Sequence, residues 1–176
     1  TCSKYTKKFS IKNYKLKENK IRVLYPYCKF ELKNKSSKNI IFSKKKYLKI
    51  LVVSRLEGKI TKGIWLMIRA LKLISKNNIF FDIVGEGSEK NSIIKFVNNS
   101  NLKNIKFHGY QKNLEKFYKE TDFTVAITDN AGFGISVLDS LYFNKPCIIS
   151  KNSASLEIIH DIEYPYLIND ENDLKG

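Results

Sequence analysis

The sequence contains only three cysteines and no long apolar run. Cys2, Cys28 and Cys147 are odd in number and far apart, a spacing that fits neither a disulfide framework nor a zinc site. We interpret them as reduced thiols in a cytoplasmic protein. The apolar run at 64–68 is broken by Arg69, so no segment reaches the roughly 20 residues that cross a bilayer. A membrane span is therefore not expected.

Acidic residues are scarce in the first part of the chain. Residues 1–50 hold 16 Lys or Arg against only Glu18 and Glu31. Residues 51–176 hold 16 basic residues and 15 acidic residues, so nearly all of the net charge of +15 lies in the first 50 positions. Arginine, the residue that most often contacts base edges, occurs only three times. We therefore expect no specific binding of nucleic acid. A solvated surface is the first interpretation of this stretch, and peripheral contact with an anionic membrane is the second.

The length and composition predict one globular domain. The chain has 176 residues, 43% of them hydrophobic, which suffices for an ordinary core. The first residue is Thr and no apolar targeting stretch follows it, so we expect a piece of a longer protein. We divide the chain into a basic, loosely held connector at 1–20 and a domain at 21–176.

Apolar runs of strand length alternate with segments of helical period. The predicted strands are 47–54, 79–85, 104–109, 122–128 and 147–150, with a short extra strand at 21–28. The predicted helices are 63–76, 89–99, 113–120 and 134–143. Continuously apolar strands separated by helices are typical of a parallel sheet buried on both faces. We therefore predict an α/β fold with a doubly wound, Rossmann-like parallel sheet, in which ligands bind at the carboxyl ends of the strands.

Two cations border the first of these strand ends. Arg55 directly follows a predicted strand and Lys62 directly precedes a predicted helix. Anions are already favoured at a helix N-terminus, so a diphosphate would fit between the two side chains. Two ordinary surface charges are the alternative.

Glycines mark two further strand ends. Gly85 and Gly87 permit a tight turn, but Lys90 stands where a dinucleotide fingerprint needs its third glycine, so a simple turn is the alternative. Gly132 and Gly134 open the helix at 134–143, where backbone N–H groups can cradle phosphate oxygens.

An acidic residue follows in the same helix. Asp139 lies about five residues beyond Gly134, within reach of a ribose diol if a nucleotide lies along the strand ends. A surface Asp on an amphipathic helix is the alternative.

Motifs of several other enzyme classes are absent. The sequence holds no HExxH, no GxxxxGK[ST] loop, no Ser-His-Asp constellation and no cluster with the spacing of metal ligands. His108, at a predicted strand end, is more typical of a structural histidine than of a catalytic one, and His160 is less notable still. Cys147 reads as a buried, small apolar residue. We expect no metal ion and no cofactor.

The order of these motifs resembles the C-terminal half of family 4 retaining glycosyltransferases of the GT-B fold. The resemblance runs from about residue 21 to the end of the chain. It rests on VVSRLEGKITKG, FDIVGEG, IKFHGY with FYKETDFTVAIT, GFGISVLDSLYFNKPCIIS and SLEIIHD. Five such segments in the family's order, at spacings compatible with loops, carry the resemblance.

The resemblance implies a role for each matching residue. The donor diphosphate would contact Arg55, Lys62, Gly134 and Ile135, and the ribose would contact Asp139. The nucleotide base would border Gly85, Gly87, Gly109 and Tyr110. The donor sugar would lie near Asp129, Asn130, Ala131, Gly132 and Phe133. The acceptor would bind chiefly in an N-terminal domain that this chain lacks.

Ala131 departs from the family pattern, which usually has a Glu there to contact the donor sugar. That contact is lost or is supplied by Asp129 or Asn130. The resemblance implies a glycosyltransferase (hexosyltransferase type) that moves a sugar from a nucleotide-diphosphate sugar to a glycan or glycolipid, as in polysaccharide or lipopolysaccharide synthesis. A noncatalytic glycosyltransferase-like subunit, which Ala131 favours, and a basic surface or nucleic-acid-binding module are the alternatives.

Overall fold

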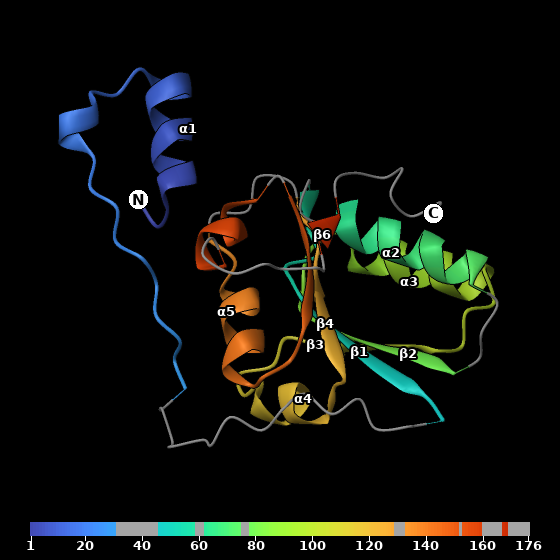
Figure 1. Ribbon diagram of the computed structural model, residues 1–176. Coiled ribbons are helices and arrows are strands. Elements are labelled where there is room, and N and C mark those ends of the chain that lie inside the picture. The colour runs from blue at the N-terminus through green and yellow to red at the C-terminus, as the bar shows by residue number, and fades with distance from the viewer. Residues whose placement is uncertain are drawn as a thin grey trace.

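A computed structural model describes residues 1–30, 46–58, 62–74, 78–128, 133–151, 153–159 and 167–168. Within these ranges the chain forms a parallel sheet of six strands in the order β3-β2-β1-β4-β5-β6 (Figure 1). The strands are β1 (Leu48–Val53), β2 (Ile79–Val84), β3 (Ile105–Gly109), β4 (Phe123–Ala126), β5 (Cys147–Ser150) and β6 (Leu167–Ile168). The predicted doubly wound, Rossmann-like class is confirmed.

Helices cover both faces of the sheet (Figure 1). On one face lie α2 (Lys62–Leu73) and α3 (Lys90–Asn99), and on the other lie α4 (Glu115–Glu120) and α5 (Ile135–Tyr142). The remaining elements are α1 (Lys4–Tyr14) and the short 3-10 helices η1 (Glu18–Lys20) and η3 (Ala154–Ile158). None of the helices in the described ranges is long and apolar enough to span a bilayer.

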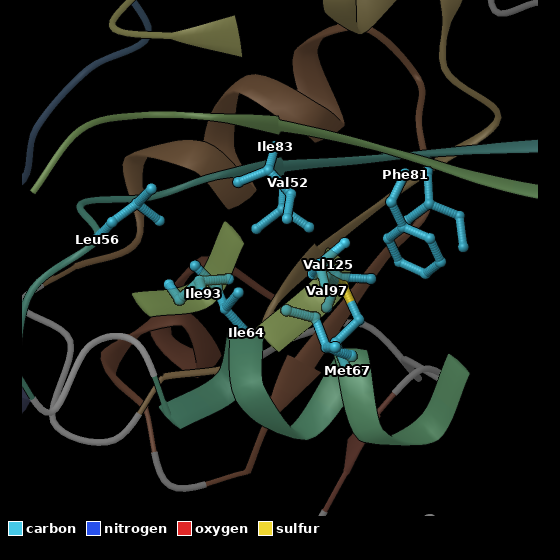
Figure 2. Packing of buried hydrophobic residues seen from close by; sticks show 11 residues of the cluster. Val52, Leu56, Ile64, Met67, Phe81, Ile83, Ile93, Val97 and Val125 are labelled. Atoms are coloured by element: carbon cyan, nitrogen blue, oxygen red, sulfur yellow. The ribbon is translucent and has the colours of Figure 1, made fainter. Parts of the chain in front are cut away.

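The main core lies between the sheet and the pair α2 and α3 (Figure 2). Alternate strand residues point to this side, and helix residues at spacings of three and four meet them. The buried members include Ile50, Val52, Phe81, Ile83 and Val125 from strands and Ile64, Met67, Ile68, Ile93 and Val97 from helices. This packing holds the beginnings of both helices close to the carboxyl ends of the strands.

The strand order reverses direction between β1 and β4. From β1 the chain proceeds to β2 and β3 on one side, and it then returns to place β4 on the other side. The loops after β1 and β4 therefore diverge to opposite faces and leave a crevice at the carboxyl edge, where doubly wound sheets bind ligands.

The strand predicted at 21–28 is wrong, because these residues lie outside the sheet and pair with none of its described strands. Within residues 1–20, α1 begins with a reciprocal capping box between Ser3 and Thr6. The loose attachment expected of residues 1–20 stays a prediction. The two-residue strand β6 was not anticipated, because it is too short to carry a periodic signal.

Candidate functional site

A pocket of about 120 Å³ opens at the carboxyl ends of β1 and β4, where the strand order reverses. Its walls come from both strands, the first turn of α2, the start of α5 and η3. The lining residues are Val52, Val53, Ser54, Gly63, Ile64, Met67, Val125, Ala126, Ile127, Thr128, Gly134, Ser136 and Ser155. Loops that lie far apart in the sequence thus meet at the predicted edge of the sheet.

Gly134 shapes one wall of this pocket. It precedes the first turn of α5 with φ at 89°, a left-handed conformation that favours glycine. A Cβ atom here would lie 2.1 Å from the Oγ of Ser155. The absence of a side chain therefore lets η3 approach the start of α5 and leaves backbone exposed to the pocket.

Gly63 produces a second close approach, at the opposite wall. A Cβ atom at Gly63 would lie 1.7 Å from the carbonyl oxygen of Ile127, so the first turn of α2 touches the backbone that follows β4. Two helices thus begin at one pocket. Since helix N-termini carry partial positive charge, the pocket suits an anion.

Arg55 follows β1 at the rim of this region. Its side chain is 72% exposed, and its Nη1 lies 3.0 Å from Oε1 of Glu57. An exposed ion pair of this kind is weak, so the guanidinium can turn to another anion at little cost. Lys62 is the first residue of α2, next to the pocket-lining Gly63, but its side chain lies outside the described residues. Convergence of the two cations stays a prediction.

Asp139 is buried at 2% exposure, so the alternative of a surface Asp on an amphipathic helix is wrong. Its Oδ1 accepts a hydrogen bond from the thiol of Cys28, with 3.5 Å between sulfur and oxygen. Burial raises the pKa of Asp139, and the hydrogen bond from Cys28 and the charge of Lys29 only partly oppose this effect. Asp139 is not among the residues that line the pocket, so its contact with ribose hydroxyls stays a prediction. Ile135, by contrast, is 53% exposed at the start of α5.

The glycines predicted to border a base lie together at the ends of β2 and β3. The backbone N–H of Gly85 donates to the carbonyl oxygen of Gly109 at 2.8 Å. A Cβ atom on Gly87 would lie 2.3 Å from the carbonyl oxygen of Leu56, so this turn packs on the loop that carries Arg55. The side chain of Tyr110 is 75% exposed beside them.

The segment predicted to lie near a donor sugar is described only in part. Phe133 is buried and its ring lies 5.5 Å from the ring of Tyr25, centroid to centroid. Asp129, Asn130, Ala131 and Gly132 lie outside the described residues. Their assignment to the sugar stays a prediction.

The hydroxyl groups of the pocket were not predicted from the sequence. Ser54, Thr128, Ser136 and Ser155 all line it, and each lies at a strand end or the start of a helix. Serine and threonine are common at strand ends and helix starts, so their presence there does not by itself predict a binding site. The only sequence signal for these residues was their position next to predicted strands and helices.

His108 takes part in an ion network on the sheet. Its Nε2 lies 2.5 Å from Oδ1 of Asp82, and Oδ2 of Asp82 lies 3.0 Å from Nζ of Lys49. The ring of Phe117 packs against the imidazole. These contacts agree with the structural interpretation of His108. Asp82, the one charge in the strand IFFDIV, was the sequence signal for this network.

Cys147 is buried as expected, and burial raises the pKa of its thiol to about 11. It packs with Val137, Ile149 and Ile159 under α5. It is therefore a core residue. His160 lies outside the described residues.

The comparisons with known proteins agree with this geometry. A family model described as "Glycosyl transferases group 1" matches residues 33–174. The poly(ribitol-phosphate) alpha-N-acetylglucosaminyltransferase of Staphylococcus aureus is 29% identical over 116 residues, which are 64% of this chain and 24% of that protein. An uncharacterized glycosyltransferase of Methanocaldococcus jannaschii is 31% identical over 122 residues, 62% of this chain and 30% of that protein. The chain thus matches about a quarter to a third of the length of these relatives.

Solved structures share the fold. Staphylococcus aureus TarM, in a structure containing UDP, fondaparinux and alpha-GlcNAc-glycerol, superposes with a TM-score of 0.74 at 20% identity. The match covers 98% of this chain and 34% of TarM. At this identity the likeness supports the GT-B type of fold and nothing finer.

Proposed function

The chain belongs to the group 1 glycosyl transferases, and from this membership and the pocket described above we propose that it is the donor-binding half of a family 4-like retaining glycosyltransferase. It would bind a nucleotide-diphosphate sugar and transfer the sugar to a glycan or glycolipid, with the acceptor bound chiefly by an N-terminal domain. The observation that carries the proposal is the pocket where the starts of α2 and α5 meet the ends of β1 and β4. A diphosphate is the part of the donor that such a site suits best.

The proposed reaction breaks the bond between the anomeric carbon and a phosphate oxygen. Positive charge develops on the sugar ring while negative charge grows on the departing diphosphate. Arg55, Lys62 and the N–H groups at the start of α5 would stabilise that growing charge. Groups aimed at charge that develops in the transition state accelerate the reaction more than they tighten substrate binding. The donor is a substrate, and the proposal includes no cofactor.

The remaining assignments concern the ribose and the base of the nucleotide. The ribose hydroxyls would bind the carboxylate of Asp139, and the base would lie against the glycine turns at Gly85 and Gly109. Similar structures of TarM and of a pneumococcal O-GlcNAc transferase contain UDP, so a uridine nucleotide is the first donor to test.

The test is nucleotide binding measured by calorimetry on the purified chain. UDP, GDP and ADP are compared, first free and then as sugar conjugates. Arg55→Ala and Lys62→Ala should each weaken binding of the preferred diphosphate by at least about tenfold, because a charge-assisted hydrogen bond contributes roughly 1.5 to 3 kcal/mol. The unfolding midpoint of Arg55→Ala should not change, since that side chain is exposed.

Lys103→Ala is the matched control. Lys103 is an exposed lysine just before β3, at the opposite edge of the sheet, and its loss should leave nucleotide affinity intact. If Arg55→Ala and Lys62→Ala bind nucleoside diphosphates as tightly as the wild type, the assigned site is wrong.

A second candidate is a noncatalytic glycosyltransferase-like subunit, which Ala131 favours. Without a Glu at this position, diphosphate and ribose contacts remain while a sugar contact is missing. Such a subunit would bind a nucleoside diphosphate and the matching nucleotide sugar equally well. A preference of more than about tenfold for one nucleotide sugar, equivalent to 1.4 kcal/mol, would favour the enzyme instead.

A further inference from the structure

The carboxylate of Glu157 binds the N-terminal arm, by which we mean residues 1–30. Its two oxygens accept the backbone N–H of Lys4 at 2.8 Å and that of Tyr5 at 2.7 Å. The hydroxyl of Tyr25 donates to the same carboxylate at 2.9 Å. One side chain of η3 thus holds the arm at two places that are 20 residues apart in the sequence.

The contact with α1 is electrostatically favourable. The first N–H groups of a helix have no partner within the helix and carry partial positive charge, so a carboxylate there stabilises the helix. The first turn of α1 has no acidic residue of its own, and Glu157 supplies the negative charge from a distant part of the chain. No residue within α1 is buried, and isolated helices of this length are marginal in water. The arm therefore depends strongly on this anchor.

The arm in turn contacts two residues of the proposed donor site, Phe133 and Asp139. The ring of Tyr25 packs on Phe133, and the thiol of Cys28 donates to Asp139. Both targets belong to the segment that forms the start and first turns of α5. Two residues further, Phe30 packs among Tyr118, Tyr142 and Phe143.

Glu157 is also close to the pocket itself. Ser155 of the same short helix lines the pocket and lies against Gly134. Glu157, which binds the arm, and Ser155, which lines the pocket, are therefore parts of the same short helix.

We propose that Glu157 is a positioning residue for donor binding, which clamps the arm so that Cys28 and Tyr25 orient Asp139 and Phe133. The inference rests on the proposed function and adds to it a residue outside the nucleotide contacts. Because the arm supports the residue assigned to the ribose, release of the arm weakens nucleotide binding. By linkage, nucleotide binding tightens the arm by the same factor.

The experiment compares Glu157→Ala with the wild-type chain, with UDP and inorganic pyrophosphate as probes. Pyrophosphate lacks a ribose, so it reports the diphosphate site alone. We expect UDP affinity to fall about fivefold in Glu157→Ala while pyrophosphate affinity is unchanged. Trypsin should cut at the lysines of the arm faster in the variant, and UDP should protect these sites in the wild type only.

Glu115→Gln is the control for loss of an acidic side chain. Glu115 lies on α4, pairs with Lys119, and takes part in none of the hydrogen bonds between Glu157 and the arm. Its replacement should change neither UDP affinity nor cleavage of the arm.

A second pair of variants tests the same idea if Glu157→Ala does not fold. Cys28→Ala removes the hydrogen bond to Asp139, whereas Cys28→Ser keeps a donor at that position. UDP affinity should fall in the alanine variant and stay near the wild-type value in the serine variant, with pyrophosphate unaffected in both.

The outcomes separate this inference from the proposed function. If Glu157→Ala frees the arm without changing UDP affinity, or weakens UDP and pyrophosphate equally, the positioning role is overturned while the proposed function stands. Weaker UDP binding without faster cleavage of the arm also overturns it. A wild-type chain that binds no nucleoside diphosphate overturns the proposed function, and this inference with it.

Discussion

Gly134 is the residue on which the shape of the candidate pocket depends most directly. Its left-handed backbone turns the chain from the end of β4 into α5, and Ser155 fills the space where a side chain would stand. The sequence indicated a phosphate-binding backbone at this glycine. The structure adds the reason that the glycine cannot be replaced, which is the approach of η3.

Gly134→Ala should therefore lower the free energy of unfolding by about 2 kcal/mol. The positive φ is unfavourable for alanine, and the new methyl group must also displace the buried hydroxyl of Ser155. Urea unfolding of both proteins measures the difference.

Gly58→Ala is the matched control for backbone strain alone. Gly58 has a positive φ of 55°, but among the described residues no atom beyond its chain neighbours lies within 4 Å of an added Cβ. Its replacement should cost only about 1 kcal/mol. If Gly134→Ala and Gly58→Ala lower the free energy of unfolding equally, contact of the new methyl group with Ser155 adds nothing to the destabilisation.

At the scale of elements, an ion network joins three adjacent strands to α4. Asp82 of β2 lies between Lys49 of β1 and His108 of β3, and Nζ of Lys49 also lies 3.0 Å from Glu120 at the end of α4. Burial acts to raise the pKa of Asp82, but hydrogen bonds from His108 and Lys49 outweigh it and lower the pKa below its ordinary value. The charged form of Asp82 is therefore stabilised by folding.

Asp82→Asn should destabilise the fold by about 1 to 3 kcal/mol at pH 7, because Asn is neutral and leaves a single acceptor oxygen for His108 and Lys49. A carboxyl whose pKa is lowered in the folded state stabilises that state above its unfolded pKa of about 3.9, and this contribution is lost as the pH falls through the folded value. The difference in the free energy of unfolding between the wild type and Asp82→Asn should thus become smaller below about pH 4. Urea unfolding at pH 7 and at pH 3 tests this.

Glu120→Gln provides the comparison. Its side chain is 46% exposed, so its ion pair with Lys49 should contribute little. If the difference in unfolding free energy between the wild type and Asp82→Asn does not change with pH, Asp82 is not charged in the folded protein.

At the scale of the whole molecule, three exposed lysines of the arm take no part in the contacts between Glu157 and the arm. The excess of lysine lies in the first 50 residues, and Lys8, Lys12 and Lys15 of the arm are all exposed. None of the three takes part in the contacts of Glu157. Any attraction to polyanions should therefore be separable from nucleotide binding.

Replacing Lys8, Lys12 and Lys15 together by Gln should weaken binding to polyphosphate or anionic vesicles and reduce its dependence on salt. Each lost phosphate contact lowers the slope of log affinity against log salt by roughly 0.7 to 0.9. UDP affinity should be unchanged. Replacing three lysines of the sheet domain, Lys103, Lys106 and Lys116, is the control. An equal loss of polyanion binding in that variant would show that the lysines of the arm are not the main polyanion-binding site.

The sequence by itself determined the order of strands and helices and the fold class of this protein. Apolar runs and helical spacing are local patterns, and strands buried on both faces admit few arrangements besides a doubly wound parallel sheet. The edge where Arg55, Gly85, Gly109 and Gly134 gather follows directly, because all strands of such a sheet end at one side.

Only the tertiary structure decided which distant side chains meet. Glu157 binds Lys4, 153 positions away, and Cys28 reaches Asp139 across 111 positions. Contacts of this kind depend on the order and register of strands and on how the arm packs, and no local period of the sequence encodes them. For the same physical reason the sequence suggested an extra strand at 21–28, where the folded chain forms a segment outside the sheet that is held by side-chain contacts of Tyr25 and Cys28.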